Sequence, residues 1–277
     1  MIAWNRYGKS RVRLVKLDRS AEPHRLVDLT IDVQLEGAFA PVYEGHNRLC
    51  LATDTMKNTV YALARQRPID HIENFGAQLA AHFVGKPAVT SARITVAEHP
   101  WVHIQGSNER HPHAFHRPGG ECWTAVVTTT NNQQPTTTVQ SGVRDLVVMK
   151  TSDSSFSGFP RDVYTTLPDT EDRILATSIT ADWMYRSGTS DFAARTRIRS
   201  ALMDAFASHQ SRSVQHTLAA MGHRALEACR DIDEITIRLP NRHHLLVDLA
   251  PFGLDNPNEV FVATDEPFGL IEGTIRR

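Results

Sequence analysis

The sequence predicts an α+β fold in which each half of the chain runs from strands through helices to strands again. Apolar and polar residues alternate over residues 10–17 and 26–37, which is typical of antiparallel strands with one wet or lumen-facing side. Apolar residues recur at helical spacing over residues 69–84 and 189–230. The two periodicities therefore predict antiparallel sheets with helices packed on them.

A second regularity predicts two tandem modules. Each half closes on a pair of strand segments interrupted by a proline, at His99-Pro100 and at Pro240-Asn241. Between the halves, residues 106–144 show little periodicity, and we expect a long hairpin or loop there. We therefore place the module boundary near residue 140, which gives an N-terminal module of residues 1–140 and a C-terminal module of residues 141–277.

Shorter patterns complete the expected elements. Thr53 and Asp54 are good N-cap residues and predict the start of another helix. Residues 146–150 and 173–183 are apolar and β-branched runs that predict strands. Residues 235–249 predict two further strands, joined by a turn at the proline already noted.

Composition excludes several classes of protein. The 277 residues are 41% hydrophobic and 22% charged, with a formal net charge of −1, which fits a globular protein and gives little support to a nucleic-acid or acidic-membrane partner. No signal peptide or membrane-spanning run is present, and the C-terminus is not a Ser-Lys-Leu peroxisomal signal. The three cysteines are far apart and predict free thiols, so we expect a cytoplasmic protein.

Common catalytic motifs are missing, and the histidines give only a weak metal signal. The sequence has no dinucleotide-binding glycine motif, P-loop, zinc-protease motif or nucleophile elbow. His111, His113 and His116 could bind zinc or copper, but prolines flank them and no acidic or cysteine ligand stands beside them. His243 and His244 would point to opposite faces of a strand. A plain loop and no metal site is therefore the favoured interpretation.

Several polar clusters each have an ordinary structural explanation. Arg173 could pair with Asp172 or Asp169 at the surface, Gln215 could be a solvated helix residue, and Phe156 could belong to the core. Composition and spacing alone do not assemble these residues into one site.

Taken together, however, the clusters closely resemble the urate oxidase family, and they occur in the family's order from about residue 7 to the C-terminus. Any one of them alone would be weak, whereas the ordered set is specific. The matching segments are residues 7–9, 52–59, 159–167, 172–177, 213–215, 239–243, and 258–271.

The resemblance implies both a fold and an activity. The family has the tunnelling fold (T-fold), in which two α+β modules per chain join their antiparallel sheets across subunits into an oligomeric barrel with helices on the outer face. It is typically a homotetramer. The implied reaction is the oxidation of urate by O2 and water to 5-hydroxyisourate and H2O2 in purine degradation, without a metal or organic cofactor.

The resemblance also assigns substrate contacts. Arg173 and Gln215 would hold opposite edges of urate, since guanidinium donors suit an anionic urea-like edge and an amide both donates and accepts. Phe156 would stack on the purine, and Val214 would add a backbone contact beside Gln215. The substrate and O2 are the expected small-molecule partners.

A second implied group carries proton transfer. Lys9, Thr53 and His243 match the family's proton relay, and Asn241 would join Thr53 around the small pocket for O2 and water. Thr53, Asp54 and Asn241 would also bind the substrate, and Thr53 and Asp54 would come from the neighbouring subunit. One departure from the family is His244, where an aromatic residue is common in relatives.

Two other hypotheses compete with this one. A T-fold relative of the GTP-cyclohydrolase or pterin-aldolase type would need cysteine and histidine zinc ligands that the sequence does not offer. A non-catalytic purine-binding T-fold homologue would keep the pocket without turnover, and the joint presence of Lys9, Thr53 and His243 argues against it.

Overall fold

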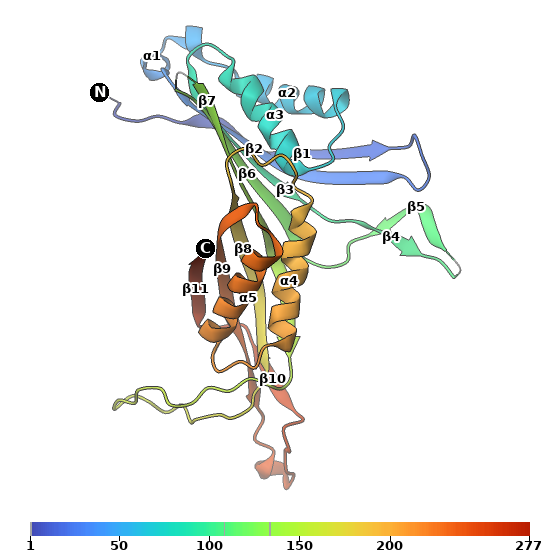
Figure 1. Cartoon of the computed structure of the whole chain (residues 1–277), viewed down its shortest axis with the longest axis vertical. Helices are drawn as coiled ribbons and strands as arrows, with labels where there is room; N and C mark the ends of the chain where they lie inside the picture. The colour runs from blue at the N-terminus through green and yellow to red at the C-terminus, as the bar shows by residue number, and fades with distance from the viewer. Residues whose placement is uncertain (1, 108, 133) are drawn as a thin grey trace. The chain divides into compact units, whose positions relative to one another are not determined.

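The computed structural model describes residues 2–107, 109–132 and 134–277 and has the predicted α+β class with antiparallel strand pairing. Its packing divides the chain into two compact units (Figure 1). Unit 1 is Met1–Val143 with Met184–Ala193, and unit 2 is Arg144–Trp183 with Ala194–Arg277. The hypothesis of two tandem T-fold modules, residues 1–140 and 141–277, stays a prediction.

Unit 1 is built on an antiparallel sheet that follows the order β1-β2-β3-β6, with β7 beginning next to β6. The predicted strands over residues 10–17 and 26–37 are confirmed and extend further than their alternation indicated. Along β2, Ile31, Val33 and Leu35 are fully buried, while the residues between them are partly exposed. The strands are β1 (Tyr7–Asp18), β2 (Arg25–Gly37), β3 (Val89–Glu98), β6 (Cys122–Asn132) and β7 (Gln134–Lys150).

Helices α2 and α3 pack on this sheet (Figure 1). The approach of α3 to β6 is close, because a Cβ at Gly76 would lie 2.8 Å from Cγ2 of Val127. The predicted N-cap of α2 is wrong, since the cap is Ala52 without a side-chain hydrogen bond, and Thr53 is the first helical residue. The helices are α1 (Ala40–Tyr43), the 3-10 helix η1 (Asn47–Leu49), α2 (Thr53–Gln66) and α3 (Ile72–Val84).

The stretch 106–144 contains a long hairpin, as expected, but little of it is loop. β6 and β7 form the hairpin, and the hydroxyl groups of Thr129 and Thr137 lie 2.9 Å apart across it. The many threonines of this stretch are strand formers because their branched side chains fit a pleated surface. Residues 108 and 133 of the stretch lie outside the described residues.

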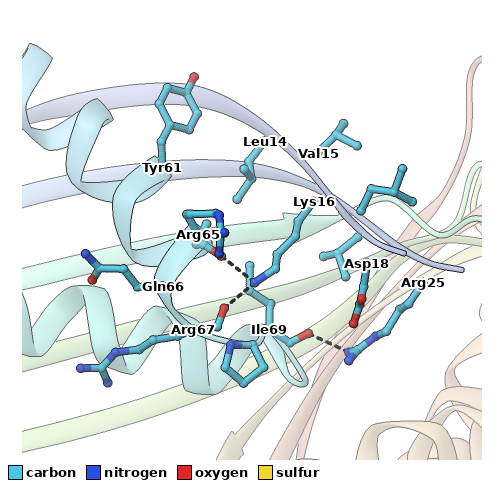
Figure 2. A pocket seen from close by; sticks show the side chains of 14 residues that line it. Leu14, Val15, Lys16, Asp18, Arg25, Tyr61, Arg65, Gln66, Arg67 and Ile69 are labelled. Carbon is cyan, nitrogen blue, oxygen red and sulfur yellow. Dashed lines mark hydrogen bonds between the residues drawn. The ribbon is translucent and has the colours of Figure 1, made fainter. Parts of the chain in front are cut away.

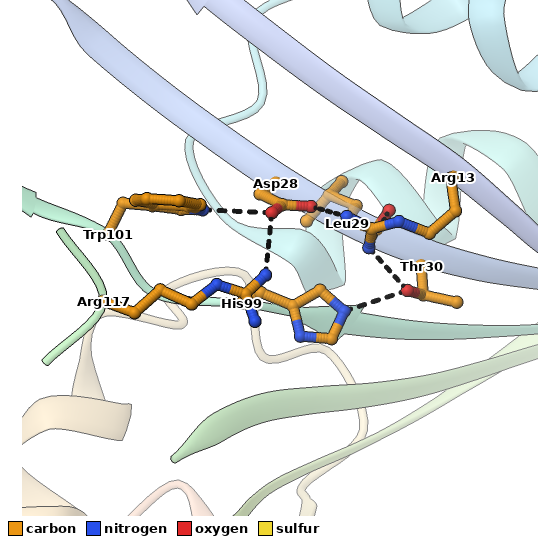
Figure 3. A network of polar contacts seen from close by, with 7 residues as sticks. All are labelled: Arg13, Asp28, Leu29, Thr30, His99, Trp101 and Arg117. Atoms are coloured by element: carbon orange, nitrogen blue, oxygen red, sulfur yellow. Dashed lines mark hydrogen bonds and ion pairs between the residues drawn. The ribbon is translucent and has the colours of Figure 1, made fainter. Parts of the chain in front are cut away.

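A two-stranded sheet leaves unit 1 as a separate arm, formed by β4 (Val102–Gln105) and β5 (Arg110–His116) (Figure 1). Figure 3 shows how the root of this arm is fastened to β2. The buried carboxylate of Asp28 accepts hydrogen bonds from Nε1 of Trp101 at 3.0 Å and Nη2 of Arg117 at 3.1 Å. The guanidinium of Arg13 donates a further hydrogen bond to the same carboxylate. Both ends of the arm therefore depend on one carboxylate.

Unit 2 contains strands β9 to β11, most of β8 and a pair of helices. Strand β9 lies next to β8 and is also paired, along different stretches, with β10 and β11. Helix α5 packs on β9 and β11 and against α4 (Figure 1). The predicted strand over 146–150 is the end of β7, and the helical stretch 189–230 is confirmed as two helices. The elements are β8 (Leu175–Tyr185), α4 (Ala194–Ser208), α5 (Val214–Ala228), β9 (Ile232–Leu246), η2 (Ala250–Phe252), β10 (Phe261–Thr264) and β11 (Leu270–Arg276).

The prediction of two strands around Pro240-Asn241 is wrong, because β9 continues through both residues. β11 pairs with β9 as far as Pro240, and β10 pairs with it from His243 onward. The proline, which has no N–H to donate, thus falls where β9 changes partners. Its carbonyl accepts the hydroxyl of Thr177 at 2.8 Å, and the N–H of Asn241 donates to the carbonyl of Gly269 at 2.8 Å.

Replacing the carboxylate at the root of the arm should destabilise unit 1. Burial alone raises the pKa of Asp28, but hydrogen bonds from Trp101 and Arg13 and the charge of Arg13 outweigh it, so the pKa lies below its ordinary value. This stabilisation is complete above the unfolded-state pKa of about 3.9 and is lost as the pH falls through the folded-state pKa. We expect Asp28→Asn to cost about 1–3 kcal/mol near neutral pH.

The measurement is Tm as a function of pH, and the loss should shrink as the pH falls because the wild type then loses the same charge. Asp70→Asn is the matched control, since its ion pair with Arg25 is exposed and contributes little. An equal loss of Tm at every pH would contradict the electrostatic role of Asp28.

Candidate functional site

The predicted site residues of unit 1 lie where the start of β1 meets the start of α2. Tyr7 joins the two, because its hydroxyl accepts a hydrogen bond from the backbone N–H of Leu51 at 2.9 Å. Burial raises the pKa of Tyr7 to about 12, so this hydroxyl stays protonated. Gly8 lets β1 approach β2 closely, since a Cβ there would lie 1.8 Å from the carbonyl oxygen of Val33. These contacts fix the backbone on either side of Lys9 and before Thr53.

Lys9, Thr53 and Asp54 differ in how far their side chains are satisfied. Asp54 accepts hydrogen bonds from Lys57 at 2.5 Å and Asn58 at 2.9 Å. The hydrogen bond and charge of Lys57 lower the pKa of Asp54, and the charge of Lys9 adds to this effect. Among the described residues, the side chains of Lys9 and Thr53 make no hydrogen bond or ion pair. The structure thus brings Lys9 near Asp54 without pairing them.

In unit 2, backbone hydrogen bonds tie three segments together. The N–H of Ser155 donates to the carbonyl of Ser211 at 2.8 Å, and the N–H of Ser211 donates to Asp153 at 2.8 Å. Phe156 and Thr170 exchange a second pair of backbone hydrogen bonds, at 2.7 and 3.0 Å. The loop that bears Phe156 is therefore fastened both to the segment before α5 and to the segment that leads into β8.

Arg173 is the most unusual side chain of this group. Its Cζ lies 5.2 Å from the centre of the Phe156 ring. Burial lowers the pKa of the Arg173 guanidinium, and its buried Nε has no hydrogen-bond partner in the part of the chain that the structure describes. A partly desolvated cation without a carboxylate is costly unless a ligand satisfies it.

The proposed surface pairing of Arg173 with Asp172 or Asp169 is wrong, because both carboxylates are engaged elsewhere. Asp172 accepts hydrogen bonds from the hydroxyl of Ser152 at 2.5 Å and the N–H of Ser154 at 3.2 Å. Asp169 accepts the N–H of Gly158 at 3.1 Å and pairs with Arg161 at 3.1 Å. These two carboxylates thus hold the loops in place, and within the described residues neither forms an ion pair with the guanidinium of Arg173.

The start of α5 places Val214 and Gln215. Ser213 is the N-cap, and its hydroxyl accepts the N–H of His216 at 3.0 Å. Val214 is buried, whereas the side chain of Gln215 is exposed and makes no hydrogen bond within the described residues. The cap fixes the first turn, so an amide that can both donate and accept is held at a defined position.

Asn241 and His243 lie on β9, two residues apart, and strand geometry puts them on the same face. Neither side chain makes a hydrogen bond to another described residue. His244 falls on the opposite face, and its Nδ1 lies 3.2 Å from the carbonyl oxygen of Arg242. The alternation of side chains along β9 therefore places His243, the predicted relay residue, and His244, the residue that departs from the family pattern, on opposite faces of the strand.

The structure therefore gathers five of the predicted residues into two groups, each within its own unit, and places Asn241 and His243 separately on β9. Unit 1 brings together Lys9, Thr53 and Asp54, and unit 2 brings together Phe156 and Arg173, with the α5 start fastened to the same loop. Sequence reasoning missed Tyr7 as an anchor and Phe159 as a neighbour of Phe156. The only signal for Phe159 was a second aromatic residue three positions after Phe156.

The histidines of the β4–β5 arm do not form a cluster that could hold a metal ion. Within the described residues, no group of three or more histidine, cysteine or acidic side chains has that arrangement. His111 and His113 contact each other edge to face, with ring centres 4.5 Å apart. Nδ1 of His103 lies 2.8 Å from the carbonyl oxygen of His111, which is a contact within the arm.

A hollow of about 540 Å³ in unit 1 lies away from all the predicted site residues. Figure 2 shows Lys16 reaching across it to the end of α2. The ammonium of Lys16 donates to the carbonyls of Ala64 at 2.6 Å and Arg67 at 2.5 Å. These are the unpaired carbonyls of a helix C-terminus, so Lys16 has a structural role there.

The fold and site together define an α+β protein that presents a free guanidinium beside an aromatic ring. A family model described as Uricase matches residues 5–128 and 139–272. A uricase from Arthrobacter globiformis is 44% identical, covering 100% of this chain and 90% of that protein, and one from Dictyostelium discoideum is 37% identical, covering 99% and 96%. The chain belongs to the uricase family.

Solved structures agree with this assignment. The crystal structure of the Arthrobacter globiformis uricase matches with a TM-score of 0.94 at 44% identity, covering 100% of this chain and 95% of that one. A uricase from Bacillus fastidious, 22% identical, shares the fold with a TM-score of 0.87, covering 98% and 93%. In the part of the chain that the structure describes, no helix has the length and apolar character needed to cross a membrane.

The free guanidinium of Arg173 should reduce the stability of the ligand-free protein. We expect Arg173→Met to raise the free energy of unfolding by about 1 kcal/mol, because it removes a partly desolvated charge that has no acidic partner among the described residues. The measurement is Tm without ligand. Arg238→Met is the control and should lower Tm, since Arg238 pairs with Asp182 at 3.1 Å and Glu272 at 3.0 Å. A lower Tm for Arg173→Met would mean that the guanidinium has a stabilising partner.

Proposed function

We propose that this protein is a urate oxidase that converts urate, O2 and water into 5-hydroxyisourate and H2O2 in purine degradation. The observation that carries the proposal is the partly buried guanidinium of Arg173, which has no acidic partner among the described residues and lies beside the ring of Phe156. A flat anion satisfies both groups, because it brings acceptors to the guanidinium and a π face to the ring. The relatives named Uricase support urate as that anion.

Substrate binding falls mainly to residues of unit 2, and Thr53 and Asp54 of the neighbouring subunit add to it. Arg173 donates to the anionic urea-like edge of urate, and Gln215 holds the opposite edge through an amide that donates and accepts. Val214 contributes a backbone contact at the start of α5. Phe156 stacks on the purine and gives the site its preference for a planar ligand.

Proton transfer falls to Lys9, Thr53 and His243, with Asn241 and Thr53 around the pocket that receives O2 and then water. Removal of protons from urate produces an electron-rich anion, which gives two electrons to O2 and is itself the reductant. Water supplies the hydroxyl group at C5, and O2 leaves as H2O2, so the reaction balances without a metal or organic cofactor. In general, a lysine can exchange a proton with a nearby hydroxyl group when the local environment makes the proton affinities of the two groups similar.

The active protein is proposed to be a homotetramer in the cytoplasm, with sites shared between subunits. Thr53 and Asp54 would come from one subunit and Arg173 from the next. The charge of Lys9 acts on Asp54, so Lys9 would belong with the first pair. The alternative is a non-catalytic purine-binding homologue, which would need the same guanidinium and ring but would have no use for the free side chains of Lys9 and His243.

The first experiment is an assay of purified protein with urate in the presence of a strong chelator. We expect loss of the near-ultraviolet absorbance of urate, with matching O2 uptake and H2O2 release. Activity that disappears with chelator and returns with added metal would overturn the cofactor-free reaction. Tight binding of urate without turnover would favour the non-catalytic alternative.

Lys9→Met should separate turnover from binding. Since Lys9 is proposed to move protons and not to hold the purine, we expect kcat to fall by about a hundredfold or more while a xanthine analogue still binds with nearly the wild-type Kd. The measurements are steady-state kinetics and a direct binding titration. An unchanged kcat would exclude Lys9 from the relay.

The same variant tests whether sites are shared. Mixing Lys9→Met with Arg173→Met under conditions that exchange subunits should restore part of the activity, because some hybrid sites receive both intact halves. Mixing Lys9→Met with a Thr53→Ala variant is the control and should restore nothing. Absence of rescue in hybrids shown to form would contradict sharing between subunits.

A further inference from the structure

Two further side chains of unit 2 lie beside the pair formed by Arg173 and Phe156. The rings of Phe156 and Phe159 are 4.8 Å apart between centroids, and their planes differ by only 10°. The guanidinium of Arg161 follows, with its Cζ 5.1 Å from the centre of the Phe159 ring. Each of the two parallel rings thus has a guanidinium near it, and of the two arginines only Arg173 belongs to the binding residues proposed above.

The end of the stack at Arg161 is held firmly. Arg161 pairs with Asp169 at 3.1 Å and donates from Nη1 to the carbonyl of Leu167 at 3.2 Å. Asp169 also accepts the N–H of Gly158 at 3.1 Å, directly before Phe159. Each of these contacts lies within residues 158–169, so they fix the orientation of Phe159 locally.

The parallel packing of Phe159 constrains the ring of Phe156. One face of that ring is covered, so a flat ligand can use only the other face. A phenyl ring on a loop loses rotational freedom when it stacks on a ligand, and this loss weakens binding. A ring already held parallel to a second ring has lost that freedom before the ligand arrives.

We infer that Phe159 and Arg161 are positioning residues of the purine site: Phe159 backs the ring of Phe156 that carries the substrate, and Arg161 holds Phe159 in place. This inference rests on the proposed function. It adds Phe159, which contacts Phe156, and Arg161, which contacts Phe159. Neither residue is proposed to touch the substrate. The backing gives the site its selectivity for planar aromatic ligands, since a misaligned Phe156 offers an edge in place of a face.

If this loop had only a structural role, substitutions in it would change the stability of the fold more than the affinity for substrate. Its neighbouring side chains Val163 and Tyr164 are 91% and 87% exposed, so the loop contributes little to the core. Substitutions in it should therefore change the affinity for substrate more than they change the stability of the fold.

The test is Phe159→Leu, which keeps an apolar side chain but removes the flat face. We expect KM for urate and Kd for a xanthine analogue to rise about three- to tenfold, while kcat stays within about twofold of wild type. Phe159→Tyr should restore wild-type values, and Arg161→Met should give a smaller rise. Tyr164→Leu is the matched control, because it changes an exposed aromatic residue of the same loop and should leave KM unchanged.

The outcomes separate this inference from the function on which it rests. If the wild-type protein neither binds nor oxidises urate, the proposed function fails and the inference fails with it. If the wild type is active and Phe159→Leu keeps its KM and Kd, only the inference is overturned. Failure of Phe159→Tyr to restore affinity, or an equal rise of KM in Tyr164→Leu, would also overturn it.

Discussion

The uncompensated charge of Arg173 is the constraint on which the proposed site depends. A guanidinium that is partly removed from water ordinarily finds a carboxylate, and Asp169 and Asp172 are among the acidic residues within four positions of Arg173 in the sequence. The loops engage both of them in other contacts, Asp172 with serines and Asp169 with Arg161. Under the proposed function, an anionic ligand offsets the energetic cost of this charge, and that cost would make the site selective for an anion.

Asp28 shows the opposite use of the same chemistry. There a buried carboxylate takes donors from two arginines and a tryptophan, and the charge is fully compensated. Such a cluster fastens the β4–β5 arm and leaves nothing for a ligand. Asp28 and Arg173 are both at least partly removed from water, but Asp28 has charged partners and Arg173 has none among the described residues. The presence or absence of a charged partner therefore distinguishes a structural ion cluster from a candidate binding group.

Local periodicity predicted much of the fold and little of the site. Alternation located β1 and β2, and helical spacing located α3, because those patterns reflect burial on one face. Local periodicity failed at Pro240. There β9 changes its pairing partner from β11 to β10, so the strand can accommodate the missing N–H of the proline, and only the tertiary pairing reveals this. The residues of the site came from family resemblance, and the stacking of Phe159 on Phe156 was not predicted because spacing cannot give ring orientation.

The division of the site residues between the two units suggests why binding and chemistry should respond differently to mutation. In the proposed site, unit 2 supplies the guanidinium, the ring and the amide that would hold a flat anion, together with His243 of the relay. Unit 1 supplies Lys9 and Thr53, whose side chains make no hydrogen bond to other described residues and so remain available for proton transfer. Asp54, next to them, directs its carboxylate to Lys57 and Asn58 of its own helix, so that it does not immobilise Lys9 in a direct ion pair. The proposed binding groups Arg173 and Phe156 and the proposed relay group Lys9 thus lie in separate clusters of contacts, so we expect the loss of one group to leave the other in place.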